Sequence, residues 1–333
     1  MYLYNYMWAT QLGGIRMLLD GIYFKNDVTE HNMKALSDTQ ARIVEQRICE
    51  LAELAEDAVN AACELIAEGY GVYEILGILS DGVSFEPSDV HKHAMAENVS
   101  RIRSYSSSVE YKDRAVLAEL LVSRLDKRGV TLSETDFLVE GSGDETFVYV
   151  KNRLADEAYD VFSQDFVDPH LRYEASLRDA ARAVSQGRAE YCLLPLEEHG
   201  GARLPSVAAL LFAEDLKICS VTPVFGFDGS ADMKYALASR HFNVPEVSPD
   251  DDRYLEIRIS AESSDLAELF SVASHLDNTV YRVNTVTFDT EDGESQYYTV
   301  VFRRSGADFC TLLTYLTLFC PSYTAVGIYN NLE

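Results

Sequence analysis

The sequence predicts a multidomain α+β protein, because its hydrophobic periodicity changes twice along the chain. Helical spacing dominates residues 1–129, strands alternate with short helices over 130–243, and a strand-rich pattern fills 253–333. The chain has 333 residues, of which 47% are hydrophobic and 25% charged, an ordinary globular composition. This length suffices for two or three compact units, and we expect three.

A long amphipathic helix is predicted over residues 37–68. Ser37 followed by Gln40 fits a capping box, and Gly69 supplies a stop. Apolar residues recur at alternating steps of four and three, which places one stripe along the helix: Val44, Ile48, Leu51, Ala55, Ala58, Ala62 and Leu65. Further helices are expected after Pro87 and over about 108–128, the last with a buried side of Leu117, Leu120, Leu121 and Leu125. We expect residues 1–29 to dock on the body as an amphipathic helix.

The middle region is predicted to be an α/β layer. Apolar strands are expected at 145–150, 171–175, 189–195, 216–224 and 233–239, and helices at 153–164, 176–186 and 205–213. Strands that alternate with helices are typical of a parallel sheet.

A linker with two prolines and three consecutive aspartates, residues 244–252, precedes the last region. Strands are expected at 254–260, 279–288, 295–305 and 323–329, with helices at 263–276 and 307–320. The resulting order, βαββαβ, predicts a ferredoxin-like unit.

The composition excludes several classes of protein. The formal charge of −26 argues against a nucleic-acid binder and against adsorption to an anionic membrane. No apolar run is long enough to span a bilayer. Six cysteines without a C-x-x-C pair, most of them in apolar runs, indicate reduced thiols in a cytoplasmic protein. The pair His91-x-His93 lacks a fixed carboxylate partner, so we expect no metal and no cofactor.

The segment from Ala180 to Val221 resembles the prephenate dehydratase family. Its small-residue helix, the strand ending in a Pro-Leu-Glu stretch, and the following helix and strand match the family at Ala183, Val184, Gly187, Pro195, Leu196, Glu197, Gly201, Leu210, Leu211, Leu216 and Ile218. The βαββαβ order at 254–329 is similar to the family's C-terminal ACT domain. The resemblance covers about 145–330. It implies a periplasmic-binding-protein-like lobe, a link to phenylalanine biosynthesis, and a homodimer or higher homo-oligomer formed through the ACT-like domain.

Departures from the family pattern favour ligand binding or regulation over catalysis. The family's Asn and Ser after the Pro-Ile-Glu stretch are Glu198 and His199 here, and its Thr-Arg-Phe motif falls on residues 233–235. Met233, in the place of the threonine, cannot donate a proton. The stretch between Thr146 and Arg240 is too short for the family's two lobes.

Two sets of residues are candidates for a ligand site. Glu197, Glu198 and His199 follow a buried strand, where α/β folds place ligands, and Lys234 offers a cation; a solvated loop is the competing interpretation. The resemblance to the ACT domain places a regulatory amino-acid site at Ser264, Asp265, Leu266 and Asn284. The expected ligand is a small carboxylate or an aromatic amino acid.

Two alternatives from other classes stay open. In the first alternative, the chain is an active carbon–oxygen lyase that converts prephenate to phenylpyruvate. In the second, it is an interaction protein. In the first case the helical unit over 1–129 would add a chorismate mutase, with Arg42, Arg47, Arg101, Arg103, Lys112 and Arg114 as its cations.

Overall fold

The computed structural model describes residues 38–67, 69–71, 75, 113–141, 145–198, 203–225, 231–248, 251–262, 266–290, 293–320 and 322–330. Contacts divide the chain into two compact units. The helical unit combines residues 1–136 with 266–276 and 310–321, and the sheet unit holds 137–265, 277–309 and 322–333. The predicted helix after Pro87, the docking of residues 1–29 and the pair His91-x-His93 lie outside the described residues.

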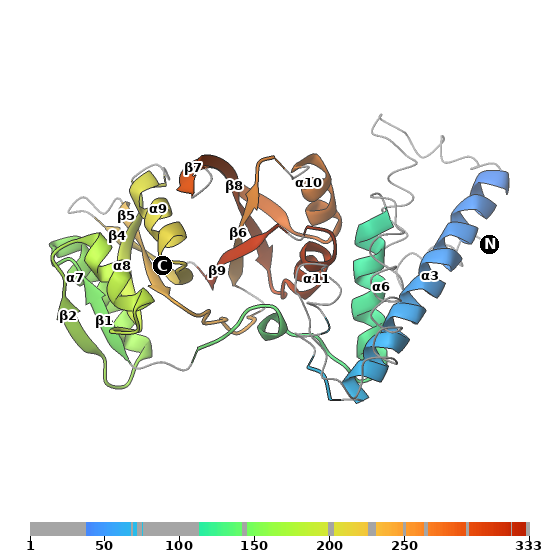
Figure 1. Cartoon of the computed structure of the whole chain (residues 1–333), viewed down its shortest axis with the longest axis horizontal. Helices are drawn as coiled ribbons and strands as arrows, with labels where there is room; N and C mark the ends of the chain where they lie inside the picture. The colour runs from blue at the N-terminus through green and yellow to red at the C-terminus, as the bar shows by residue number, and fades with distance from the viewer. Residues whose placement is uncertain are drawn as a thin grey trace. The chain divides into compact units, whose positions relative to one another are not determined.

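The helical unit contains α3 (Asp38–Ala67), α6 (Arg114–Lys127), α10 (Leu266–His275), α11 (Cys310–Phe319) and the 3-10 turn Glu134–Asp136. Helices α3 and α6 lie side by side (Figure 1). The predicted stripe of α3 is buried at Leu51, Ala55, Ala58, Ala62 and Leu65, and the predicted side of α6 is buried at Leu117, Leu120, Leu121 and Leu125. The hydrophobic spacing therefore predicted this packing correctly.

Helix α6 also contacts α10 and α11. The guanidinium of Arg114 donates to Glu268 of α10 at 3.2 Å and lies over the ring of Phe319 at 5.4 Å. The hydroxyl of Tyr315, on α11, donates to the same carboxylate at 3.0 Å. The chain thus covers a face of α10 and α11 with its own helix.

The sheet unit contains β1 (Thr146–Tyr149), β2 (His170–Tyr173), β3 (Tyr191–Glu198), β4 (Lys217–Phe225), β5 (Ala231–Ser239), β6 (Asp252–Ser260), β7 (Thr279–Thr290), β8 (Gly293–Ser305) and β9 (Thr324–Asn330). They form one sheet in the order β2-β1-β3-β5-β4-β9-β6-β8-β7. The predicted central and C-terminal regions therefore share a single sheet.

The expectation of a parallel layer is correct for β1, β2 and β3 and wrong for β5. Strand β5 pairs antiparallel with both β3 and β4. The physical reason is the short connection, because residues 226–230 alone join Phe225 to its register partner Ala231. Parallel neighbours need a crossover of a dozen or more residues, whereas a short turn makes an antiparallel hairpin.

Helices cover both faces of the first half of the sheet. Helix α7 (Arg153–Phe162) packs on one face with Phe147, Leu193 and Leu237. Helices α8 (Leu177–Ser185) and α9 (Pro205–Ala213) pack on the other face, where Cys192 and Leu194 point. Adjacent residues of β3 thus face opposite layers, as strand geometry requires.

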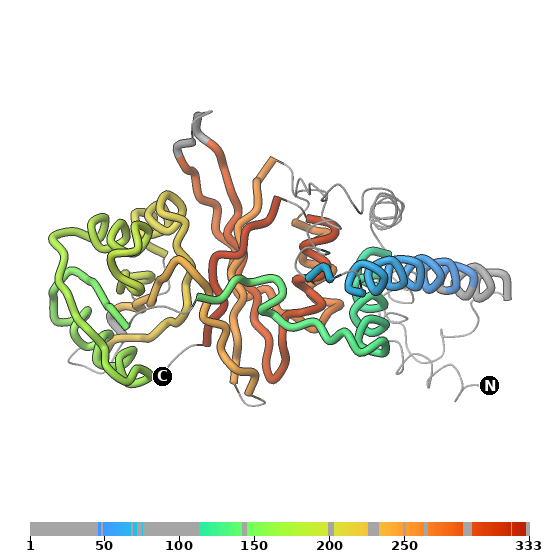
Figure 2. The backbone as a smooth tube through the Cα atoms, turned by 60° about the horizontal axis from the view of Figure 1, so that its bottom comes forward, coloured from blue at the N-terminus to red at the C-terminus, as the bar shows by residue number. Residues whose placement is uncertain are grey.

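The second half of the sheet has the predicted βαββαβ chain order, with its strands in the order β9-β6-β8-β7. Strands β7 and β8 form a long antiparallel pair, which Figure 2 follows along the backbone. Strand β9 joins this half to the first through a parallel bridge between Gly327 and Ile218. A Cβ atom at Gly327 would lie 2.9 Å from the Ile218 carbonyl oxygen, so this junction requires glycine.

Among the described helices, none combines the length and the apolar character that a bilayer crossing requires.

Candidate functional site

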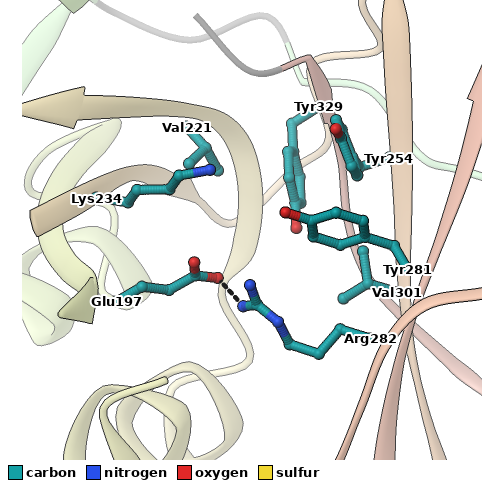
Figure 3. A pocket seen from close by; sticks show the side chains of 8 residues that line it. All are labelled: Glu197, Val221, Lys234, Tyr254, Tyr281, Arg282, Val301 and Tyr329. Atoms are coloured by element: carbon teal, nitrogen blue, oxygen red, sulfur yellow. Dashed lines mark hydrogen bonds and ion pairs between the residues drawn. The ribbon is translucent and has the colours of Figure 1, made fainter. Parts of the chain in front are cut away.

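A small pocket lies in the sheet unit beside Glu197 (Figure 3). It leaves about 10 Å³ for the centre of a water-sized molecule, which is about the room that one water needs. Seven strands, β3 to β9, supply its lining: Glu197, Val221, Lys234, Tyr254, Tyr281, Arg282, Val301 and Tyr329.

Three β-bulges surround this pocket. The pairing register shifts between Pro195 and Glu197 on β3, between Val280 and Arg282 on β7, and on β9 opposite Glu256. A regular strand would turn Tyr281 and Arg282 to opposite faces, but both line the pocket. Bulges re-aim side chains and are frequent beside binding sites, so this irregularity is what assembles the pocket.

A buried ion network forms one wall. Glu197 pairs with Arg282 of β7, and its carboxylate oxygen lies 3.6 Å from the guanidinium of Arg203. Arg203 in turn donates to Glu256 of β6 at 2.7 Å, and the Tyr329 hydroxyl donates to the same carboxylate at 3.1 Å. Side-chain exposure is 7% for both Glu197 and Arg203 and 2% for Glu256.

Local pairing fixes the position of Arg203. A backbone bridge joins Arg203 to Glu197, and the amide of Leu204 donates to the carbonyl of Leu196 at 3.1 Å. Arg203 and Leu204 therefore lie beside the end of β3, which places the guanidinium of Arg203 between two carboxylates.

The network shifts the pKa values of its members. Burial by itself would lower the pKa of Arg203, but the carboxylate of Glu256, Tyr329 and the carboxylate of Glu197 raise it above its ordinary value. Burial also opposes the charge of Arg282, whose pKa is nevertheless raised by its hydrogen bond with Glu197. Burial and the Glu256 carboxylate raise the pKa of Tyr329 well above its ordinary value. Both arginines therefore stay charged.

The chemistry of the lining suits an anionic aromatic molecule. Arg282 and Lys234 are cations of the kind that bind carboxylates. The ring of Tyr254 stacks on Tyr329 with centroids 5.8 Å apart, and meets Tyr281 edge-on at 5.1 Å. Within the described part of the chain, no group of three or more His, Cys, Asp or Glu side chains could hold a metal ion.

The predicted site residues have different outcomes. Glu197 and Lys234 are register partners across β3 and β5 and line the same pocket. Glu198 is exposed at the end of β3, opposite Met233. His199, Ser264 and Asp265 lie outside the described residues. None of these placements tests ligand binding, which stays a prediction.

The remaining two candidates lie in different units. Leu266 begins α10 in the helical unit, and Asn284 lies within β7, opposite Thr299. The side-chain nitrogen of Asn284 is buried and has no hydrogen-bond partner.

Sequence reasoning missed the C-terminal strands' share of the pocket and of its ion network, namely Tyr254, Glu256, Tyr281, Arg282, Val301 and Tyr329. Alternation along β7 predicts opposite faces for Tyr281 and Arg282, and only the bulge overrides it. The available signal was the charged Arg282 within an otherwise uncharged run, Thr279–Thr287.

No protein-family model and no curated protein match the chain. Solved structures do resemble it. Prephenate dehydratase from Streptococcus mutans is 10% identical, over 56% of this chain and 99% of that chain, with a TM-score of 0.46. Prephenate dehydratase from Arthrobacter aurescens in complex with L-Phe is 13% identical, over 55% and 89%, with a TM-score of 0.42. GqqA, described as a novel type of quorum quenching acylase, is 17% identical, over 56% and 96%, with a TM-score of 0.42.

Two of these three structures are prephenate dehydratases, the family that the sequence resembles. The chain has a mixed α/β fold with a large sheet and helices. A likeness of fold does not by itself imply a shared activity.

Proposed function

We propose that this chain is a ligand-binding, regulatory relative of the prephenate dehydratases, with a C-terminal ACT-like unit and a link to aromatic amino acid biosynthesis. The observation that carries the proposal is the hairpin of β4 and β5. Its register pairs Phe225 with Ala231, so residues 226–230 make the whole connection. The family resemblance would require a second lobe at this place in the chain, and a single lobe cannot enclose a substrate from both sides.

The chemistry of the reaction supports the same proposal. Loss of hydroxide from prephenate needs a group that protonates the leaving oxygen, and cations that hold a dicarboxylate. Met233 stands at the position that the resemblance gives to the family's threonine, and a thioether has no proton to give.

A turnover and binding experiment tests the proposal. The purified full chain is incubated with prephenate while phenylpyruvate absorbance is followed, and with chorismate while its loss is followed. We expect no turnover in either assay. We also expect phenylalanine, tyrosine or phenylpyruvate to raise the thermal midpoint, because a ligand at 100 times its Kd adds about 2.7 kcal/mol to the free energy of unfolding.

Two results would contradict the proposal. Turnover of prephenate that is lost in Lys234→Ala would make the chain a dehydratase. The absence of both turnover and any ligand-induced shift at millimolar concentration would leave an interaction protein. A matched control for Lys234→Ala is Lys151→Ala, since Lys151 lies over the ring of Tyr173 and not among the residues that line the pocket.

A homodimer is part of the proposal. Helix α6 covers a face of α10 and α11 in the helical unit, so that face is not open to a partner. Strand β7 is an edge strand of the sheet in the described part of the chain. Side chains of β7 such as Tyr281 and Val283 are 45% and 37% exposed. Because edge strands invite pairing with another chain, we expect dimerisation through β7, which sedimentation of Val283→Lys against wild type checks.

A further inference from the structure

Glu197 holds its carboxylate where the carboxylate of a bound ligand would be expected. It is buried against two guanidinium groups, at the edge of a pocket lined by three tyrosine rings. Taking the proposed function as given, we propose that this pocket binds a small aromatic monocarboxylate, whose carboxylate replaces that of Glu197 on Arg282. Glu197 is then an internal competitor that keeps the pocket closed.

The ion network allows this exchange. When Glu197 leaves, Arg203 keeps Glu256 as a partner at 2.7 Å, and Glu256 keeps the Tyr329 hydroxyl at 3.1 Å. Arg282 alone would lose its carboxylate. A half-buried guanidinium without a counter-ion is costly, so an incoming carboxylate is stabilised there by a charge-assisted bond of the same kind.

Glu197 lies close to the surface of the sheet unit, so its side chain can turn toward solvent. Glu197 directly follows the bulge of β3, and the next residue, Glu198, is already exposed. On another side of the pocket, Tyr281 is 45% exposed. In this proposal the side chains of Glu197 and Tyr281 rotate to open the pocket to solvent, and neither is one of the apolar residues that make up the hydrophobic clusters of the sheet unit.

The remaining lining selects an aromatic group. Tyr254, Tyr281 and Tyr329 already form stacked and edge-on pairs, and Val221 and Val301 supply apolar contacts (Figure 3). Rings placed against such a cluster gain offset-stacked or edge-to-face contacts that a saturated ring does not. The closed pocket has room for about one water, so binding requires that the Glu197 carboxylate move away.

The test measures binding of phenylacetate to the full chain by calorimetry, with phenylacetamide as the uncharged analogue and cyclohexylacetate as the non-aromatic one. Glu197→Gln removes the competing charge and keeps the shape of the side chain. We expect Glu197→Gln to bind phenylacetate about tenfold tighter than wild type. We expect Arg282→Met to bind it at least thirtyfold more weakly, and neither analogue to match phenylacetate.

Matched controls carry the same change of charge outside the pocket. Glu157→Gln removes one member of an exposed pair with Arg153, and Arg303→Met removes one member of an exposed pair with Asp252. Both controls should bind phenylacetate as wild type does. If Arg282→Met does not fold, as judged by circular dichroism, Arg282→Lys replaces it, and a threefold or greater loss is expected because the forked guanidinium contact is lost.

The proposal is overturned if Glu197→Gln gains no affinity, or if the Arg282 variant binds as tightly as wild type. A chain that binds aromatic amino acids with unchanged affinity in both variants keeps the proposed function but places its ligand elsewhere. A chain that binds nothing, in wild type and in Glu197→Gln, contradicts both.

Discussion

The substitution Glu256→Gln tests whether the buried ion network stabilises the sheet unit. Glu256 is 2% exposed at its side chain and accepts hydrogen bonds from Arg203 at 2.7 Å and from Tyr329 at 3.1 Å. Glutamine keeps the volume and removes the charge. Breaking a buried pair by removing one partner costs about 3–5 kcal/mol, because the other charge stays buried.

The lower end of that range applies here. After the substitution, Arg203 still has the Glu197 carboxylate at 3.6 Å, so its charge is not left entirely without a partner. We therefore expect a loss of about 3 kcal/mol from the free energy of unfolding. For a domain of this size, 1 kcal/mol corresponds to about 2–4 °C in Tm, so the midpoint should fall by about 6–12 °C.

Urea denaturation followed by circular dichroism measures the effect, and a double-mutant cycle with Arg203→Met isolates the pair. The double variant should lose less than the sum of the two single variants. Glu157→Gln is the control, because its exposed pair with Arg153 should contribute less than about 1 kcal/mol. A loss below about 1 kcal/mol in Glu256→Gln, or additive losses in the cycle, would refute the reasoning.

Two further predictions concern the sheet. Gly327→Ala should cost about 1–3 kcal/mol of unfolding free energy by denaturant titration, because its Cβ would lie 2.7 Å from the Ile218 Cβ and 2.9 Å from the Ile218 carbonyl oxygen. Burial raises the pKa of Cys219 to about 12 from an ordinary value of 9.0, so the folded state favours the neutral thiol. The contribution of the buried neutral thiol to the free energy of unfolding is complete below pH 9. It is lost as pH rises toward 12, by up to about 1.4 kcal/mol per pH unit, because the thiol of the unfolded chain ionises first. Cys219→Ala should flatten the fall of stability in that window, and an unchanged slope would contradict the assignment.

The sequence predicted helices and strands well where one periodicity ran without interruption. The helix predicted over 205–213 has those bounds, and the long helix predicted over 37–68 differs from α3 by one residue at each end. Proline at the first helical position and the apolar stripe of α3 are local signals, and nothing in the tertiary structure opposes them.

The direction of β5 and the composition of the pocket depend on non-local geometry. The direction of β5 follows from the small number of residues between Phe225 and Ala231 and not from the apolar pattern of the strand. Glu197 and Lys234 were found because the first lies near the carboxyl end of a buried strand and the second lies in a matched motif. Arg282 and Tyr281 were missed because a bulge, which alternation does not reveal, turns both into the pocket.

The bridge between Ile218 and Gly327 has a consequence for biosynthesis. During translation β4 emerges well before β9, which follows every other strand in chain order. Until β9 arrives, the β4 edge that faces away from β5 is an unpaired template, and such edges promote aggregation of nascent chains. We therefore expect ribosome-bound chains that stop before Thr324 to need chaperone protection, and full-length chains to be released from it.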